Sequence, residues 1–322
     1  MAENQYIYAV ARVRSREQSL LTEAFFSQLV QAADYNACMR LLKEKGWGAE
    51  AALDPEDMLA AQREKTWSFL KEIVEDSSIF NVFLYGNDYH NLKAAIKEAY
   101  TGKDFPDLYM KEGTVDYRVI QKAAAENDFQ TLPEGMRGPA AEAAKVLAHT
   151  GDGQLCDVII DQGALTAIRQ AGEASGDDFL KLYGELTAAA GNIRIAARAA
   201  RTGKDEAFLG RALADCRTLN KEELIRAAAK GEAAVADYLE KTEYREAAGE
   251  LRKSVRAFEI WCDNLLMRRI RPQIHNPFGL GPLAAYILAR ENEGKMVRII
   301  LSGKRNGLGE DVIRERMRET YV

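Results

Sequence analysis

Asn192-Ile-Arg-Ile-Ala-Ala-Arg-Ala-Ala-Arg-Thr-Gly-Lys204 is one of three related stretches in this chain. The other two are NLKAAIKEAYTGK at 91–103 and NEGKMVRIILSGK at 292–304. Each stretch opens with Asn, carries Lys or Arg six residues later and a small hydroxyl residue ten residues later, and closes with Gly-Lys. A repeat of roughly 100 residues is too long for one unit of a thin solenoid, so the pattern predicts three related helical lobes.

The spacing of side chains within each stretch predicts the last three turns of an α-helix. In the second copy, small apolar residues recur on one helical face and Arg194, Arg198 and Arg201 recur on another. A glycine after the last turn is the usual helix stop, because it adopts a positive φ without a Cβ clash. We therefore expect Gly102, Gly203 and Gly303 to end their helices.

The same Gly-Lys pairs do not fit a phosphate-binding loop. That motif needs a first glycine five residues before the second, and a preceding strand. The first-glycine position is occupied by Lys97, Arg198 and Arg298, and no strand is predicted before any copy. Nucleotide binding through this motif is therefore excluded.

Composition favours a helical protein. The chain has 322 residues, 47% of them hydrophobic, with only 7 prolines and a net charge of −5 in which acids and bases are interspersed. This balance argues against a general nucleic-acid binder. The four cysteines lack zinc-site spacing and are expected to be buried hydrophobic residues in a reducing compartment. With no apolar run of membrane-spanning length and no secretory signal, we expect a cytoplasmic protein.

Local signals place several further helix boundaries. Asp54-Pro55-Glu56 is a typical helix start, and Thr218 to Glu222 is a capping signal for a helix through Ala229. The apolar run from Ile79 to Tyr85 resembles a strand, but we expect it to be helical because no partner strand is evident. The sequence thus predicts an all-α protein whose lobes cover residues 1–125, 126–229 and 230–322.

Two carboxylate pairs at i, i+4 spacing form a weaker repeat. Glu259 and Asp263 lie on one predicted helix face, and Asp157 and Asp161 have the same spacing before the second copy. Ion pairs with Arg268, Arg269 or a repeat arginine are the expected role. The alternative is an enzyme that uses Glu259, Cys262, Asp263 and His275, but no recognised catalytic motif accompanies these residues.

Without a convincing active site, the exposed basic faces become the candidate interfaces. Pseudo-threefold lobes could enclose a cup, and the basic residues would then line it or pair with acids between helices. The interface candidates are Lys97, Arg194, Arg198, Arg201, Glu259, Asp263 and Arg298.

Several segments resemble the C subunit of bacterial and archaeal V-type (A-type) ATPases, known as the d subunit in the eukaryotic vacuolar enzyme. They are YGNDYHNLK at 85–93, the second copy at 192–204, FEIWCDN at 258–264, EGKMVRIILSGK at 293–304 and the terminal Tyr321-Val322. The resemblance implies an all-helical funnel of three pseudo-repeats around a pseudo-threefold axis, with no active site and no cofactor.

The resemblance also implies a function and partners. The funnel would be a central-stalk rotor component that receives the shaft, made of the D and F subunits, and rests on the membrane rotor ring of proteolipid (c/K) subunits. It would couple ATP hydrolysis or synthesis to proton or sodium transport from a peripheral position on the membrane complex. A free-standing helical scaffold remains a second reading, and the small-molecule enzyme described above a third.

Overall fold

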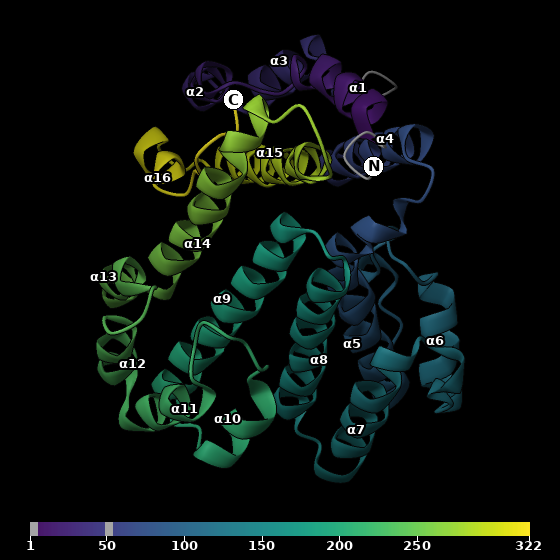
Figure 1. Cartoon of the computed structure of the whole chain (residues 1–322), viewed down its shortest axis with the longest axis vertical. Helices are drawn as coiled ribbons and strands as arrows, with labels where there is room; N and C mark the ends of the chain where they lie inside the picture. The colour runs from purple at the N-terminus through teal and green to yellow at the C-terminus, as the bar shows by residue number, and fades with distance from the viewer. Residues whose placement is uncertain (1–5, 49–53) are drawn as a thin grey trace. The chain divides into compact units, whose positions relative to one another are not determined.

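The computed structural model describes residues 6–48 and 54–322, and all regular secondary structure in these ranges is helical. The all-α prediction is therefore confirmed (Figure 1). The chain forms two compact units. Unit 1 combines Met1–Ser77 with Ile260–Val322, and unit 2 is the continuous segment Ser78–Glu259.

Unit 1 is built from helices of both ends of the chain. Its main helices pack against α15, as Figure 1 shows for α1 and α4. Around α15 (Gly281–Arg305) lie α1 (Ile7–Glu17), α2 (Glu23–Gln31), α3 (Tyr35–Glu44), α4 (Pro55–Ile73), the 3-10 helix η5 (Arg271–His275) and α16 (Glu310–Arg314).

The helix starts of unit 1 follow from their first residues. Asp34 caps α3 by accepting from the Ala37 amide, and Asp54 caps α4 by accepting from the Glu56 amide. The predicted start at Asp54-Pro55 is thereby confirmed, because a side-chain oxygen satisfies an otherwise unpaired amide of the first turn.

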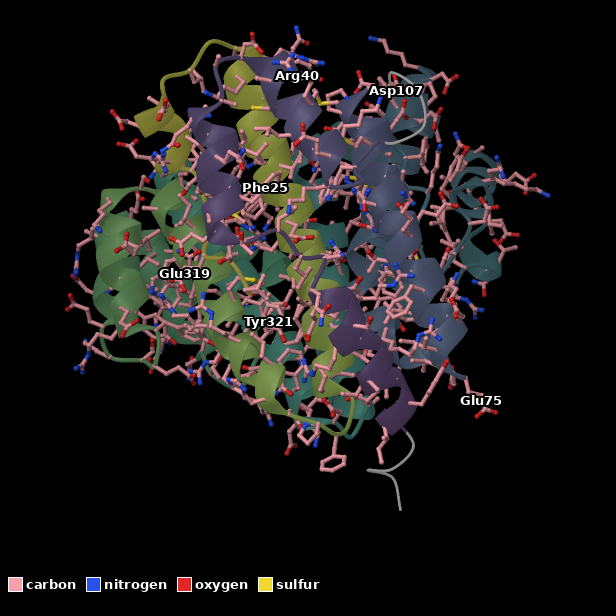
Figure 2. The ribbon with its side chains drawn as sticks, turned by 90° about the horizontal axis from the view of Figure 1, so that it is seen from above. Phe25, Arg40, Glu75, Asp107, Glu319 and Tyr321 are labelled. Carbon is pink, nitrogen blue, oxygen red and sulfur yellow. The ribbon has the colours of Figure 1, made fainter. Side chains whose placement is uncertain are left out.

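The core of unit 1 joins α2 and α3 to α15. Phe26 and Leu29 of α2 and Leu42 of α3 are buried in one cluster with Met296 and Ile300 of α15. Phe25, labelled on α2 in Figure 2, belongs to the same cluster. Burial of such side chains stabilises the unit by about 1.5–3 kcal/mol each, so the two ends of the chain depend on one another.

Apart from α14 (Val255–Ile270), which crosses the boundary, unit 2 contains the remaining helices in sequence order. They are the 3-10 helix η2 (Ser77–Phe83, which begins at the unit boundary), α5 (Tyr85–Thr101), η3 (Pro106–Leu108), α6 (Tyr117–Glu126), η4 (Phe129–Thr131), α7 (Glu134–Thr150), α8 (Gly153–Ala174), α9 (Asp178–Thr202), α10 (Glu206–Ala212), α11 (Lys221–Lys230), α12 (Glu232–Leu239) and α13 (Arg245–Lys253).

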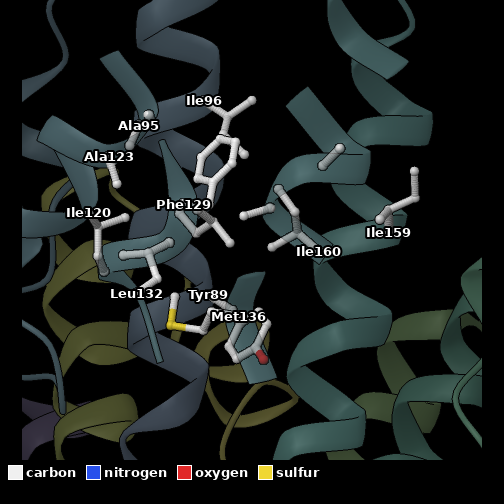
Figure 3. Close-up of a cluster of buried hydrophobic side chains, with 14 of the residues drawn as sticks. Tyr89, Ala95, Ile96, Ile120, Ala123, Phe129, Leu132, Met136, Ile159 and Ile160 are labelled. Atoms are coloured by element: carbon white, nitrogen blue, oxygen red, sulfur yellow. The ribbon is translucent and has the colours of Figure 1, made fainter. Parts of the chain in front are cut away.

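One core cluster of unit 2 lies among α5, α6, η4, α7 and α8. Figure 3 shows Tyr89, Ile120, Phe129, Met136 and Ile160 gathered in it. The Tyr89 hydroxyl donates to the Gly135 carbonyl at 2.9 Å. A large buried ring thus keeps its polar atom satisfied.

Helices α8 and α9 approach closely because glycines lie at their contact. A Cβ added at Gly172 of α8 would lie 2.5 Å from the Leu180 carbonyl oxygen, and one at Gly184 of α9 would lie 3.0 Å from the Ile168 carbonyl oxygen. Both obstructing atoms are backbone and cannot rotate away. The spacing of the two helices therefore requires glycine at these positions.

The expected glycine stops hold for two of the three repeated helices. Gly102 and Gly203 follow α5 and α9 with φ of 64° and 65°. The prediction for Gly303 is wrong, because α15 continues to Arg305 and a later residue, Gly307, takes the positive φ of 66°. Gly303 is buried instead, and an added Cβ would lie 2.7 Å from Cγ1 of Ile313.

Two other local predictions are partly right. The apolar run at 79–85 is helical as expected, although most of it forms the 3-10 helix η2 before α5 begins at Tyr85. The cap of α11 is Asn220, whose side chain accepts from the Glu223 amide, rather than Thr218. The Thr218 hydroxyl is committed elsewhere, since it donates to buried Glu185.

One helix crosses the boundary between the units. α14 runs from Val255 to Ile270, and the boundary falls between Glu259 and Ile260. A boundary between compact units need not coincide with a boundary between repeats, so the division into three lobes stays a prediction. Within the described ranges, no helix is long and apolar enough to cross a membrane.

Candidate functional site: the three repeated helices

The three copies of the repeat form the C-terminal parts of α5, α9 and α15, and each begins with a buried asparagine. The side-chain amide of Asn192 forms two hydrogen bonds to the backbone of one residue, Ala214, an arrangement that we call an asparagine clamp. Its Nδ2 donates to the Ala214 carbonyl at 2.7 Å, and its Oδ1 accepts from the Ala214 amide at 2.9 Å. Asn91 holds Met110 in the same way, at 3.0 and 2.8 Å.

The third asparagine shows a variation of this clamp. Asn292 Nδ2 donates to the Glu319 carbonyl at 2.9 Å. The Glu319 amide, however, donates to Oδ1 of Asn264 on α14 at 2.9 Å. In all three copies the asparagine therefore fixes a segment that follows its helix, which explains why the repeat opens with Asn.

Buried acids hold the same following segments in unit 2. Asp88 accepts from the Thr114 amide and hydroxyl and from the Val115 amide. Glu185 accepts from the Arg217 amide and from the amide and hydroxyl of Thr218. Burial raises the pKa of Asp88, while the bonds from Thr114 and Val115 oppose that rise. Both acids therefore have a structural role, since each accepts two backbone N–H groups and a Thr hydroxyl from the segment that follows; in Glu185 all three bonds go to Oε1, and the buried Oε2 accepts no hydrogen bond from the described residues.

The tail of the chain is fastened in unit 1. Tyr321 is buried and its hydroxyl donates to Glu17 at 3.1 Å, while Glu319 accepts from Arg268 at 3.0 Å (Figure 2). Burial, together with Glu17, raises the pKa of Tyr321. The terminal Tyr that the sequence analysis singled out is thus part of the folded core.

The repeated cation of each copy pairs with an acid outside its own repeat. Lys97 lies 2.6 Å from Asp157, and Arg198 lies 2.8 Å from Glu259. Arg298 lies 2.6 Å from Glu56, far back in the sequence. In the predicted lobes the pairs run from the first to the second, from the second to the third, and from the third to the first.

The acids at i, i+4 spacing, Asp157 with Asp161 and Glu259 with Asp263, also form ion pairs with cations of the repeats. Asp161 pairs with Lys93 at 2.6 Å. Asp263 accepts from Lys295 at 2.8 Å and from Arg318 at 2.9 Å. The expected pairing of these acids with repeat cations is therefore confirmed for Glu259, whose partner is Arg198. Of the alternatives expected for Glu259, the repeat arginine is the one observed, and Arg268 instead lies 3.0 Å from Glu319.

The basic stripe on α9 is exposed as expected. Arg194, Arg198 and Arg201 are exposed, while Ile193, Ala196 and Ala197 on the opposite face are buried. Arg201 forms a two-point contact with Glu232, and Arg194 makes no ion pair with any described residue.

These pairs orient the helices more than they stabilise them. The Arg198 side chain is 63% exposed and that of Glu259 31%. Pairs this exposed contribute about 0–1 kcal/mol each. The exposed cations consequently remain available to acidic groups of a partner.

The residues of the enzyme alternative come from two elements, with Glu259, Cys262 and Asp263 on α14 and His275 in η5. Cys262 lies half-exposed on α14, and His275 is exposed at the end of η5. Cys38 and Cys156 are buried as expected, whereas that expectation is wrong for Cys216 and Cys262, which are only partly buried. Burial raises the pKa of Cys156 to about 11, which keeps it a thiol. Across the part of the chain that the structure describes, no group of three or more His, Cys, Asp or Glu could hold a metal ion.

Comparison with known proteins gives one consistent result. The model of the ATP synthase (C/AC39) subunit family matches residues 9–316. The C subunit of the V-type sodium ATPase of Enterococcus hirae is 25% identical over 96% of this chain and 97% of its own. The C subunit of the V-type ATP synthase of Thermus thermophilus is 26% identical over 92% and 93%, and that of the A-type ATP synthase of Methanocaldococcus jannaschii is 23% identical over 96% and 85%.

Proposed function

The chain belongs to the ATP synthase (C/AC39) subunit family, and we propose that it is the non-catalytic central-stalk component of a V-type or A-type rotary ATPase. In this role it forms a socket between the shaft, made of the D and F subunits, and the membrane ring of proteolipid subunits. It transmits torque between ATP hydrolysis or synthesis and the transport of protons or sodium. It is then a cytoplasmic protein, peripheral to the membrane.

The pairing order of the repeated cations carries this proposal. Each of Lys97, Arg198 and Arg298 pairs with an acid of the next predicted lobe, and the third returns to the first. Such a closed order is what three related lobes around a pseudo-threefold axis require, with the lobes at 1–125, 126–229 and 230–322. A funnel built this way has a mouth suited to an axle.

The exposed stripe on α9 supports the choice of shaft-binding residues. A surface that must hold a turning partner in one orientation benefits from matched charges, because charge complementarity fixes register more than it adds affinity. We assign the shaft contact to Arg194, Arg198 and Arg201, with Lys97 and Arg298 as their equivalents on the other repeats. Glu259 and Asp263 act indirectly, by orienting Arg198, Lys295 and Arg318.

The decisive experiment compares membranes with and without this chain. In membranes that lack it, ATP-driven ion pumping should be lost, whereas ATP hydrolysis by the soluble head should continue. Adding the purified chain should restore pumping. Unchanged pumping, or absence of the chain from purified intact complexes, would favour the free-standing scaffold instead.

The shaft contact has a sharper test. Arg198→Glu should weaken binding of the D and F subunits, whereas Arg118→Glu, which reverses an exposed charge on α6 of the same unit, should leave it unchanged. Unchanged shaft binding with a lowered melting temperature would assign the stripe a purely internal role. Turnover of a small molecule by the isolated chain, abolished by Cys262→Ala or Glu259→Gln, would favour the enzyme.

A further inference from the structure

A large cavity in unit 1 carries an excess of positive charge that neither the repeats nor the proposed shaft contact uses. Its volume is about 560 Å³, within the usual size of small-molecule sites. Four cations line it from separate elements. Arg16 comes from α1, Lys45 from the end of α3, Lys65 from α4 and Arg290 from α15, against a single lining acid, Glu72.

Most of this charge is not neutralised within the protein. Glu72 is paired with Arg12 at 2.9 Å, and Arg290 with Glu293 at 2.8 Å. Arg16, Lys45 and Lys65 have no carboxylate partner among the described residues. Like charges brought together without counter-charges repel one another, so an arrangement of this kind favours binding of an anion.

Arg290 gives the cavity a preorganised floor. Its side chain is only 13% exposed, and its three nitrogens bind Tyr286, Glu293 and Ser19 at 3.2, 2.8 and 2.6 Å. Each terminal nitrogen retains a second N–H. A guanidinium held in one orientation presents these to a ligand at little further entropic cost, which is the geometry that phosphate recognition uses.

The remaining walls combine rings with hydroxyl groups. The Arg16 guanidinium lies 5.0 Å from the centre of the Phe69 ring, which lines the cavity, whereas the Lys45 ammonium lies 5.3 Å from the ring of Phe25, which does not line it. Ser19 and Ser68 also line the cavity. Cations held against aromatic faces are partly desolvated but keep their N–H groups free for an anion.

We propose that this cavity binds a small ligand with two linked phosphate groups, the pyrophosphate unit that free pyrophosphate shares with nucleoside diphosphates. A phosphate ester carries about −1.5 to −2 at neutral pH, so two phosphate groups roughly match the three cations without a partner. Arg290 contacts one phosphate at the floor, and Lys65 and Arg16 hold the other near the mouth. The inference is independent of the rotor role, because the site lies within one unit and needs no other protein chain.

Binding is tested by calorimetry on the full purified chain with inorganic pyrophosphate, ADP and inorganic phosphate. Pyrophosphate and ADP should bind with a stoichiometry near one and at least about tenfold more tightly than phosphate, with affinity falling as salt rises. The double substitution Arg16→Gln/Lys65→Gln should weaken pyrophosphate at least about tenfold. Lys71→Gln, an exposed lysine on the same helix α4 outside the cavity, should change it less than about twofold.

Several outcomes would overturn the proposal. One is no pyrophosphate binding at millimolar concentration by a chain whose circular dichroism and melting temperature are normal. Another is an equal loss of affinity with Lys71→Gln. A third is binding to vesicles of anionic phospholipid that free pyrophosphate does not displace, which would make this face a membrane-surface contact instead. All three readouts use the isolated chain, so they remain informative whether or not the socket role holds.

Discussion

The asparagine clamps offer the most direct test of the repeat, through Asn192→Ala. This change removes both partners of Ala214, whose amide and carbonyl lie in a site with no solvent exposure. A buried polar group left without a partner costs about 1–3 kcal/mol, so the two together should lower the free energy of unfolding by about 4 kcal/mol. Urea denaturation followed by circular dichroism measures this change.

The other two copies supply a predicted ranking. Asn91→Ala also breaks two bonds, but Met110 is only partly buried and water can replace them in part, so the loss should be about 2 kcal/mol. Asn292→Ala breaks one bond to partly buried Glu319 and should cost about 1 kcal/mol. Asn306→Ala is the control. That exposed side chain donates only to the Ser302 carbonyl of its own helix, so its loss should change the free energy of unfolding little.

The chain has two compact units, so its unfolding need not be a single two-state transition. A second measurement that reports on unit 2 alone is therefore needed. Amide hydrogen exchange at Ala214 should quicken in Asn192→Ala while exchange in the core of unit 1 stays slow. If Asn192→Ala unfolds within about 0.5 kcal/mol of the unmodified chain, or if the three alanine variants show no ranking, the clamp is not what stabilises the repeat.

Three further predictions concern pairing, packing and pH. A double-mutant cycle on Arg198 and Glu259 should give a coupling below about 1 kcal/mol in unfolding free energy, because both are partly exposed, and a larger value would contradict an orienting role. Gly172→Ala should destabilise the chain by about 2 kcal/mol, because its Cβ would meet a fixed carbonyl, whereas Gly210→Ala, with nothing within 4 Å, should be neutral or stabilising; equal melting temperatures would refute the close α8–α9 contact. Burial raises the pKa of Glu293 from 4.5 to about 7, so between these values the folded chain holds a proton that the unfolded chain has lost. Stability should therefore rise as pH falls from 8 to 6, and Glu293→Gln should flatten that slope in melting experiments; an unchanged slope would show that Glu293 is ionised throughout.

Local sequence signals predicted those features that depend on a few neighbouring residues. The helix class, the start at Asp54-Pro55 and the stops at Gly102 and Gly203 follow from propensity and capping chemistry alone. Gly303 shows where that reasoning fails. The same Gly-Lys pattern lies inside α15, and the glycine there leaves room for the side chain of Ile313, ten residues on, instead of ending the helix.

The interface candidates were recognisable by charge and period, but their partners were not. The repeat singled out Arg198 as the conserved position of a cation within the three copies, and the helical period placed it on the basic face of its helix, opposite the apolar residues. That Arg298 pairs with Glu56 depends on tertiary packing across most of the sequence, which spacing does not encode. The sequence shows that an asparagine begins each copy. Its role, to bind the backbone of a segment that follows the helix, became evident only from the three-dimensional structure.

The cavity was missed for a related reason. Arg16, Lys45, Lys65 and Arg290 come from four different elements, and no linear motif connects them. For Arg16, Lys45 and Lys65 a signal did exist, because none of them has an acid three or four residues away in the sequence, whereas Arg290 has Glu293 at i+3. Such a signal is too common among surface lysines and arginines to have selected these three.

The division of unit 1 between the two ends of the chain has a consequence during synthesis. Phe26 and Leu29 of α2 acquire their neighbours Met296 and Ile300 only when α15 has left the ribosome. Unit 2, continuous in sequence, can be complete well before then. The first helices to be translated are thus among the last to be buried, and their apolar faces are what a chaperone would encounter on a nascent chain.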